Sequence, residues 1–307
     1  MSPQIFQNLL RRGSGFVKLH QNLVSRSYSV AASTSTEQSS SDEFILKYIE
    51  KEGQGKIAVL GMNRPRAKNA FSKNLIAKFE ESIHTVRFDK DVRAVIIRSL
   101  VPGIFCAGAD LKERLTMKAS EVGPFVARLR AFVSAMETMP MPIIAALDGA
   151  ALGGGLEMAL ACDLRVASDS AKMGLVETRL AIIPGGGGTQ RLPRIVGPAI
   201  AKELIFTGRV IDGAEAHQIG LVNQVVEQNK EGDAAYNRAV ELAEEILPNG
   251  PIGVRMAKIA ISRGSEVDLA SGLAIEEQCY AQIVNTKDRI EGLVAFKEKR
   301  PPRFQGE

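Results

Sequence analysis

The alternation of short apolar strands with amphipathic helices between residues 44 and 167 constrains the fold more than any other feature of the sequence. The run Ala94-Val95-Ile96-Ile97 lies between Arg93 and Arg98 and is typical of a strand buried on both faces of a sheet. Further strands are predicted at 142–147 and 164–167. Because helices separate these strands, we expect crossover connections between them, and the chain is assigned to the α/β class.

The remaining elements are predicted from periodicity and turn residues. Strands at 44–49 and 56–60 are expected to form a hairpin through Gly53-Gln54-Gly55. One helix is predicted to begin after the N-cap residue Ser72. Two more helices are predicted at 122–139 and 156–162, the second preceded by a turn at 149–155. After Asp233 the chain is predicted to be nearly all helical, in four segments: 233–247, 251–263, 268–284 and 286–299.

The first 41 residues differ from the rest in composition. Residues 1–36 are rich in serine and contain four basic residues but no acidic one: Arg11, Arg12, Lys18 and Arg26. An amphipathic, arginine-rich segment without acids is typical of an organelle transit peptide, whereas a secretory signal needs an uninterrupted apolar stretch. We therefore predict a mitochondrial transit peptide and linker at 1–41 and a mature protein in the matrix. A plain unstructured tail is the alternative.

Charge, cysteine and histidine usage argue against several classes of protein. The net charge of +4 equals the charge of the four leader cations, so the remainder is near neutral and gives no support for a general nucleic-acid surface. The sequence contains no apolar run of about 18 residues, the length that indicates a membrane-spanning helix. Cys106, Cys162 and Cys279 form no CxxC pair, and the three histidines lie far apart. The sequence therefore predicts neither a disulfide framework nor a metal site.

Three glycine-containing segments stand out as candidate sites. In Ala107-Gly108-Ala109-Asp110, after an apolar strand, glycine lets a peptide N–H face a ligand, although a plain tight turn would look the same. Gly153-Gly154-Gly155 lies at a strand-to-helix junction, where free N–H groups at a helix N-terminus can stabilise an anion. This segment matches neither a P-loop nor the dinucleotide GxGxxG pattern. A tight helix start, with Glu157 complementing the helix dipole, is the alternative.

The third segment consists of Glu177 followed by the glycine run 185–188. Four consecutive glycines predict close approach of the backbone to a ligand or to another segment, with a flexible surface loop as the alternative. Together, two backbone donors and two carboxylates suit one reaction. An enolate oxygen forming on a thioester needs preorganised N–H donors, and water addition to the adjacent double bond needs a base and an acid.

These motifs, in this order, resemble the enoyl-CoA hydratase/isomerase (crotonase) superfamily over about residues 44–305. The likeness runs through Phe105 to Glu113, Gly153 to Glu157 and Ile183 to Leu192, and it ends at Ala295 to Arg300. The resemblance implies a crotonase-type spiral of ββα turns with a helical C-terminal trimerisation region. The implied organisation is a spiral core at 42–232 and an oligomerisation region at 233–307, assembled as a homotrimer or a hexamer.

The resemblance also implies roles for individual residues. The N–H groups of Ala109 and Gly154 would form an oxyanion hole, Glu157 would activate water, and Glu177 would exchange the proton at the α-carbon. Lys299, from this subunit or a neighbouring one, would meet a phosphate of coenzyme A. No cofactor is implied beyond the coenzyme A that carries the substrate. The other residues implied to line the coenzyme A site are Arg66, Lys68, Ala70, Ala107, Gly108 and Asp110.

The implied reaction is hydration of a 2-enoyl-CoA thioester. Two segments, 174–178 and 298–303, carry a closer likeness to family members that convert 3-methylglutaconyl-CoA to 3-hydroxy-3-methylglutaryl-CoA in leucine degradation. Short-chain enoyl-CoA hydration, double-bond isomerisation and binding of AU-rich RNA are the alternatives. One family member is described as binding such RNA through a lysine-rich helix. Here the matching helix has Lys73, Lys78 and Arg87 against Glu80 and Glu81, so only weak RNA binding is expected.

Overall fold

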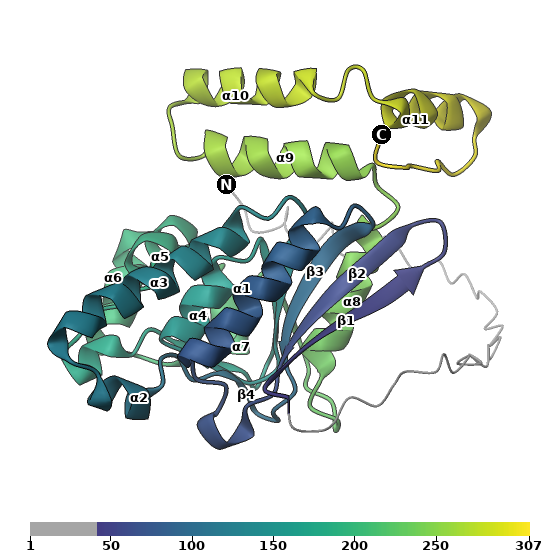
Figure 1. Ribbon diagram of the computed structural model, residues 1–307. Coiled ribbons are helices and arrows are strands. Elements are labelled where there is room, and N and C mark those ends of the chain that lie inside the picture. Colours follow the sequence, from purple (N-terminus) through teal and green to yellow (C-terminus); the bar gives the residue numbers. More distant parts are fainter. Residues whose placement is uncertain (1–41) are drawn as a thin grey trace, which may run out of the picture. The chain divides into compact units, whose positions relative to one another are not determined.

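Two sheets form the framework of the chain in the computed structural model, which describes residues 42–307 (Figure 1). The predicted leader at 1–41 lies outside the described residues. The larger sheet has the order β1-β2-β3-β5-β7-β10; β1 and β2 form the predicted antiparallel hairpin, and every later pairing is parallel. Its strands are β1 (Phe44–Lys51), β2 (Gly55–Met62), β3 (Val92–Ser99), β5 (Ile143–Leu147), β7 (Leu164–Ser168) and β10 (Gln224–Val226).

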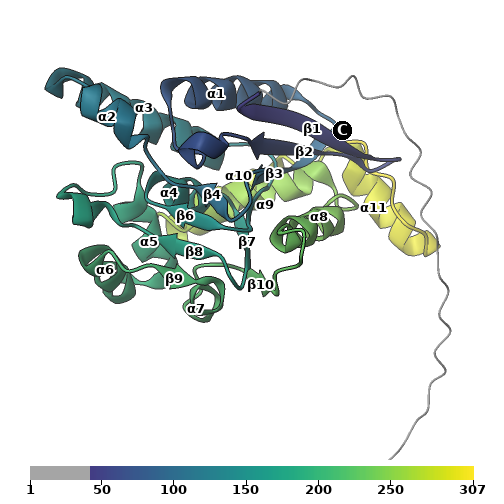
Figure 2. The same ribbon diagram turned by 90° about the horizontal axis from the view of Figure 1, so that it is seen from below.

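The inner strands of the larger sheet, β2, β3, β5 and β7, are mostly buried on both faces, as their apolar residues predict. In β3, Val95 and Ile97 belong to the main core, whereas Ala94 and Ile96 belong to a second core on the opposite face. Helix α8 (Ala234–Ile246) contributes three alanines to that second core. Figure 2 shows α8 and α1 (Lys73–Phe88) on opposite faces of this sheet. Alternate side chains of one strand therefore stabilise two separate layers.

The smaller sheet positions the candidate site. Its order is β4-β6-β8-β9, and the first three strands are mutually parallel neighbours. They are β4 (Ile104–Cys106), β6 (Ala150–Leu152), β8 (Lys172–Gly174) and β9 (Ile211–Asp212). The turn predicted at 149–155 was therefore wrong in part, because three of its residues form β6. These residues are only two alanines and a leucine, and pairing with β4 and β8 makes them a strand.

Helices cover the sheets at the predicted positions and at several others. The predicted helices after Ser72, at 122–139 and at 156–162 correspond to α1, α3 (Ala119–Glu137) and α4 (Gly154–Leu160). Ser72 caps α1, because its hydroxyl accepts a hydrogen bond of 3.1 Å from the N–H of Leu75. The helices for which no prediction was made are α2 (Leu111–Thr116), α5 (Gly188–Val196), α6 (Pro198–Thr207) and α7 (Gly213–Gln218).

The four predicted C-terminal helices are confirmed as α8, α9 (Pro251–Gly264), α10 (Leu269–Ala281) and α11 (Lys287–Glu298). Helix α8 packs on the larger sheet, whereas α9 and α10 lie side by side beyond it (Figure 1). Buried Lys258 ties α9 to the core, since its ammonium donates to Asp163 at 2.7 Å and to the carbonyl of Met141 at 3.0 Å. The domain boundary at residue 232 stays a prediction. None of the described helices is long and apolar enough to cross a membrane.

Candidate active site

The candidate site lies at the carboxyl ends of three adjacent parallel strands. Strand β4 leads into Ala107–Asp110, β6 leads into Gly153 and α4, and β8 leads into the 3-10 helix η3 (Glu177–Leu180). Neighbouring strands of a sheet lie about 4.8 Å apart, so groups that follow their ends meet. The carboxyl ends of parallel strands are also where open α/β sheets bind ligands. The three segments singled out in the sequence are therefore brought together.

The two segments that contain the predicted oxyanion donors are in close contact, through Gly108 on one side and Gly154 on the other. A Cβ atom built on Gly108 would approach the nitrogen of Gly154 to 3.1 Å and the carbonyl oxygen of Leu152 to 2.9 Å. Within residues 42–307, the N–H groups of Ala109 and Gly154 have no hydrogen-bond acceptor. Gly154 is also the first residue of α4, where the helix dipole adds partial positive charge. The two donors are thus available to an anion.

Glu157 is a buried carboxylate that the backbone holds in place. Its side chain projects from the first turn of α4, and the residue is 2% exposed. Its Oε1 accepts from the N–H of Gly188 at 2.7 Å, and its Oε2 accepts from the N–H of Gly186 at 2.9 Å. Burial raises the pKa of Glu157, and these two hydrogen bonds oppose that rise because they favour the ionised form.

Glu177 is also largely buried, but no N–H group of the glycine run donates to its carboxyl group as two do to Glu157. Its Oε2 is buried and has no hydrogen-bond partner among the described residues. Burial, with the negative charge of Glu157 adding to it, raises the pKa of Glu177 to about 7. A Cβ atom built on Gly153 would lie 3.1 Å from Oε1 of Glu177, and the φ of Gly153 is +50°. Glycine is therefore needed there, so that the carboxyl can lie against the backbone.

The glycine run 185–188 is a site of close approach and not a loose loop. Cβ atoms built on Gly186 and Gly188 would lie 2.6 and 3.0 Å from the carboxylate oxygens of Glu157. The first of these distances is shorter than any real Cβ contact, so a side chain at Gly186 would displace the carboxylate. The expectation of close backbone approach is confirmed, and the approaching group is Glu157.

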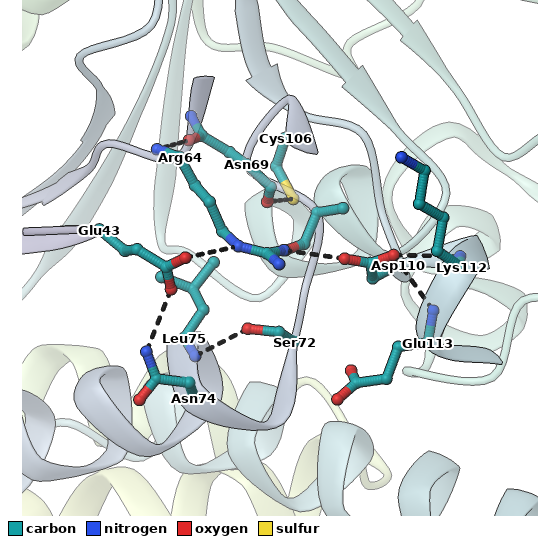
Figure 3. A network of polar contacts seen from close by, with 11 residues as sticks. Glu43, Arg64, Asn69, Ser72, Asn74, Leu75, Cys106, Asp110, Lys112 and Glu113 are labelled. Atoms are coloured by element: carbon teal, nitrogen blue, oxygen red, sulfur yellow. Dashed lines mark hydrogen bonds and ion pairs between the residues drawn. The ribbon is translucent and has the colours of Figure 1, made fainter. Parts of the chain in front are cut away.

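A polar network fixes the loop that precedes α1 against the loop after β4 (Figure 3). The guanidinium of Arg64 donates to Glu43 at 2.9 Å, to the carbonyl of Ala70 at 2.7 Å and to Asp110 at 3.0 Å. Asp110 also caps α2 through the N–H groups of Lys112 and Glu113. Asp110, proposed from the resemblance as a coenzyme A residue, is thus already bonded to Arg64 and α2, and its direct role toward coenzyme A stays a prediction.

Asn69 anchors the same loop from inside. The residue is fully buried, its Nδ2 donates to Ser99 Oγ at 2.8 Å and to the carbonyl of Phe105 at 3.0 Å, and its Oδ1 accepts from the N–H of Arg64 at 2.7 Å. Lys68 and Asn69 both have positive φ, a conformation that asparagine tolerates better than most residues. Neither Arg64 nor Asn69 was identified from the sequence, because no local pattern shows that the loop must be tied to β4.

Of the remaining residues predicted to bind coenzyme A, five lie in or next to the site loops, and one, Lys299, lies at the end of α11. Arg66 and Lys68 are exposed next to the site loops and form no ion pair within residues 42–307, so their charges are free to meet an anion. Ala70 and Gly108 are buried, and Ala107 donates its N–H to the carbonyl of Lys68 at 3.0 Å. Lys299 is exposed at the end of α11, and its side chain forms no hydrogen bond or ion pair with the site loops in the described chain. Its predicted role stays a prediction.

The structure adds Gly186, Gly188 and two arginines, Arg130 and Arg191, to the surroundings of Glu157. The glycine run was visible in the sequence, but its partner could not be known without the fold. No group of three or more histidine, cysteine or acidic side chains gathers as a metal site within residues 42–307. All three cysteines are free and buried.

Comparison with known proteins agrees with this geometry. A family model described as enoyl-CoA hydratase/isomerase matches residues 52–307. Mitochondrial methylglutaconyl-CoA hydratases of Rattus norvegicus and Homo sapiens are 62% identical over 273 residues, which is 89% of this chain and 86% and 80% of theirs. The mitochondrial enoyl-CoA hydratase domain-containing protein 2 of Homo sapiens is 60% identical over 245 residues, covering 80% of this chain and 84% of that protein.

Solved structures give the same result. An enoyl-CoA hydratase from Bacillus anthracis superposes with a TM-score of 0.82 at 45% identity, covering 87% of this chain and 100% of that one. The predicted crotonase-type fold is confirmed, and mitochondrial relatives at this identity indicate a mitochondrial location. The chain therefore belongs to the enoyl-CoA hydratase/isomerase family, an enzyme family, as the sequence motifs predicted.

Proposed function

We propose that the chain hydrates 3-methylglutaconyl-CoA to 3-hydroxy-3-methylglutaryl-CoA with Glu157 and Glu177 as base and acid. The observation that carries the proposal is the difference between the two carboxyl groups. Two N–H donors favour the ionised form of Glu157, whereas burial, with one carboxyl oxygen lacking a hydrogen-bond partner among the described residues, favours the neutral form of Glu177. Two acids with separated pKa values divide into a proton acceptor and a proton donor.

In the proposed reaction, Glu157 takes a proton from water as the oxygen attacks the β-carbon of the substrate. The electrons of the double bond move to the thioester oxygen, where the N–H groups of Ala109 and Gly154 stabilise the enolate. Glu177 then delivers its proton to the α-carbon. Donors already fixed in place cost no reorganisation as charge develops, and one such donor contributes about 10²–10³-fold in rate. The reaction uses only these groups, water and the coenzyme A thioester.

The acyl group is inferred from relatives. The proteins named methylglutaconyl-CoA hydratase share 62% identity with this chain, and the likeness extends through the segments that carry Glu157 and Glu177. We therefore expect 3-methylglutaconyl-CoA to have a higher kcat/KM than crotonyl-CoA or 3-methylcrotonyl-CoA, which lack its distal carboxylate. Loss of the conjugated thioester absorbance measures hydration of all three. Equal or lower kcat/KM for 3-methylglutaconyl-CoA would contradict the assignment.

Substitution of each glutamate tests the mechanism. Glu157→Gln and Glu177→Gln keep shape and remove proton transfer, so each is expected to lower kcat by about 10²–10⁴-fold. The double variant should lose less than the product, because both groups serve one transition state. Exchange of solvent deuterium into the α-carbon should depend on Glu177 more than on Glu157. Near-normal hydration by Glu177→Gln, with Glu157→Gln inactive, would contradict the two-carboxylate mechanism and favour an isomerase-like use of one working glutamate.

We also propose that the chain assembles as a homotrimer or hexamer in the mitochondrial matrix. The support is the apolar surface of α10 and α11, whose exposed side chains include Leu269, Leu273, Tyr280, Leu293 and Phe296. Sedimentation at micromolar concentration tests the assembly; a monomer would contradict it.

Binding of RNA is expected to be weak. Of the three cations of α1, Lys78 lies 3.6 Å from the carboxylate of Asp42, and Arg87 donates to the carbonyls of Ala135 and Thr138. Only Lys73 is left without such a partner within residues 42–307, so few phosphate contacts are available. Tight binding of an AU-rich oligonucleotide at physiological salt would contradict this expectation.

A further inference from the structure

The glycine run 185–188 has the carboxylate of Glu157 on one side and two guanidinium groups on the other. Arg130, on α3, donates from Nε to the carbonyl oxygen of Gly185 at 3.1 Å. Arg191, on α5, donates from Nη1 to the carbonyl oxygen of Gly186 at 3.0 Å. The N–H of Gly186 points to Glu157. The run is therefore a layer of peptide groups between two cations and an acid.

One peptide group of the run is hydrogen-bonded to a cation at its oxygen and to Glu157 at its nitrogen. The bond between Gly185 and Gly186 is trans, so its C=O and N–H point in opposite directions. Its oxygen accepts from Arg130, and its N–H donates to Glu157. A cation at the oxygen polarises the peptide and increases the partial positive charge on the hydrogen that faces the carboxylate. Arg130 thus stabilises the negative charge of Glu157 through this peptide group, without a hydrogen bond to the carboxylate.

Arg191 is built into the same layer. Its side chain is only 13% exposed, and Nη2 is held by Glu137 Oε2 at 2.8 Å and Ser134 Oγ at 3.2 Å. A Cβ atom on Gly187 would lie 2.1 Å from Nη1 of Arg191, so the guanidinium can lie there only against glycine. Glycines at 186 and 187 therefore leave room for the Glu157 carboxylate and the Arg191 guanidinium, two groups of opposite charge, beside one short segment.

We infer that Arg130, through the Gly185–Gly186 peptide group, and Arg191, through its charge and its hydrogen bond to the carbonyl of Gly186, are positioning residues that keep Glu157 ionised and oriented for water activation. The inference rests on the proposed role of Glu157 as the base. Among the described residues, the charges that act on Glu157 include those of the two arginines and of Glu177 on η3, and Glu137 on α3 pairs with Arg191. The charges of Arg191 and Arg130 also lower the pKa of Glu157 directly, although burial has the larger, opposite effect.

The pH dependence of catalysis tests the inference. Arg130→Gln and Arg191→Gln should each move the acid limb of kcat/KM upward by roughly 0.5 pH unit, since Glu157 must be ionised to accept a proton. At a pH below that limb, each variant should lose about threefold in kcat/KM, and activity should recover as pH rises. Arg130→Lys should restore the limb, because it retains the charge. Arg128→Gln on α3 and Arg194→Gln on α5 are matched controls, because both arginines pair with other acids and contact no glycine of the run.

Two outcomes separate this inference from the proposed function. An unshifted acid limb in Arg130→Gln and Arg191→Gln, with hydration retained, overturns the inference alone. The same holds for a uniform loss of activity at all pH values, which a purely structural role would produce. If no enoyl-CoA is hydrated, the proposed function fails. The inference is then decided without turnover, by infrared titration of the Glu157 carboxylate assigned with Glu157→Gln: an upward move of its midpoint in the arginine variants supports it, and an unchanged titration overturns it.

Discussion

Replacement of Glu177 by glutamine should stabilise the folded protein and do so increasingly as pH rises. Burial raises the pKa of Glu177 to about 7 from an ordinary value of 4.5. Below about pH 4.5 the carboxyl is protonated in both folded and unfolded chains, and ionisation costs nothing. Between about pH 4.5 and 7 the unfolded chain ionises first, so the wild type loses stability as pH rises. Glutamine cannot ionise, and the variant is spared this loss.

The size of the effect follows from the difference between the folded and unfolded pKa values of Glu177. A tenfold difference in acid dissociation constant corresponds to about 1.4 kcal/mol, so the gain of the variant over wild type should grow by about 2 kcal/mol between roughly pH 5.5 and 8.5. Because the carboxyl is not fully buried, water reduces this figure, and we expect about 1–2 kcal/mol. The same change should abolish most hydration, so stability and activity should move in opposite directions.

Urea unfolding at a fixed protein concentration measures the prediction, since dissociation of an oligomer would otherwise shift the midpoint. The quantity to compare is the difference in unfolding free energy between Glu177→Gln and wild type at the two pH values. Glu227→Gln is the matched control, because Glu227 is exposed and forms no ion pair in the described chain. A difference that is equal at both pH values for Glu177→Gln would refute a raised pKa and, with it, the role of Glu177 as a neutral proton donor.

Three further changes test other parts of the structure. Asn69→Ala removes three buried hydrogen bonds and leaves alanine at a φ of +54°, so urea unfolding should show a loss of about 2–4 kcal/mol. Gly155→Ala places a Cβ 2.2 Å from the carbonyl oxygen of Cys106, and we expect little soluble protein, or a loss of at least about 3 kcal/mol. Lys299→Ala should raise KM for coenzyme A esters more than it lowers kcat, because a phosphate contact is uniform binding; an unchanged KM would remove Lys299 from the site.

The larger sheet and the long helices could be predicted because their signals are local. The apolar run 94–97 requires burial on both faces, and the stripe of Leu75, Ile76, Phe79 and Ile83 defines one helix face. Strand β6 was missed for the opposite reason. Two alanines and a leucine between Gly149 and Gly153 are too few to have a strand pattern of their own, and pairing with β4 and β8 is what makes them a strand.

Some features of the candidate site could likewise be predicted from local sequence signals, and others could not. An anion site at the start of α4 could be proposed because a helix start rich in glycine leaves N–H groups free, whereas the role of Glu157 as the base was implied by the family resemblance. That Glu157 is held by Gly186 and Gly188 could not be predicted, because these groups lie far apart in the sequence. The raised pKa of Glu177 likewise depends on burial, which comes from three strands meeting and not from the residues next to it.

The smaller sheet also has a consequence for how the chemistry of this protein could change. Each of its first three strands leads to one proposed function: the two proposed donors for the enolate oxygen follow β4 and β6, and the proposed proton donor Glu177 follows β8. The donors belong to the backbone and survive almost any substitution, whereas the acids are side chains. A lineage that loses Glu157 or Glu177 would therefore keep its ability to stabilise an enolate. In the proposed site, the anion-binding N–H groups come from the backbone, whereas the acid–base groups around them are side chains that substitution can exchange.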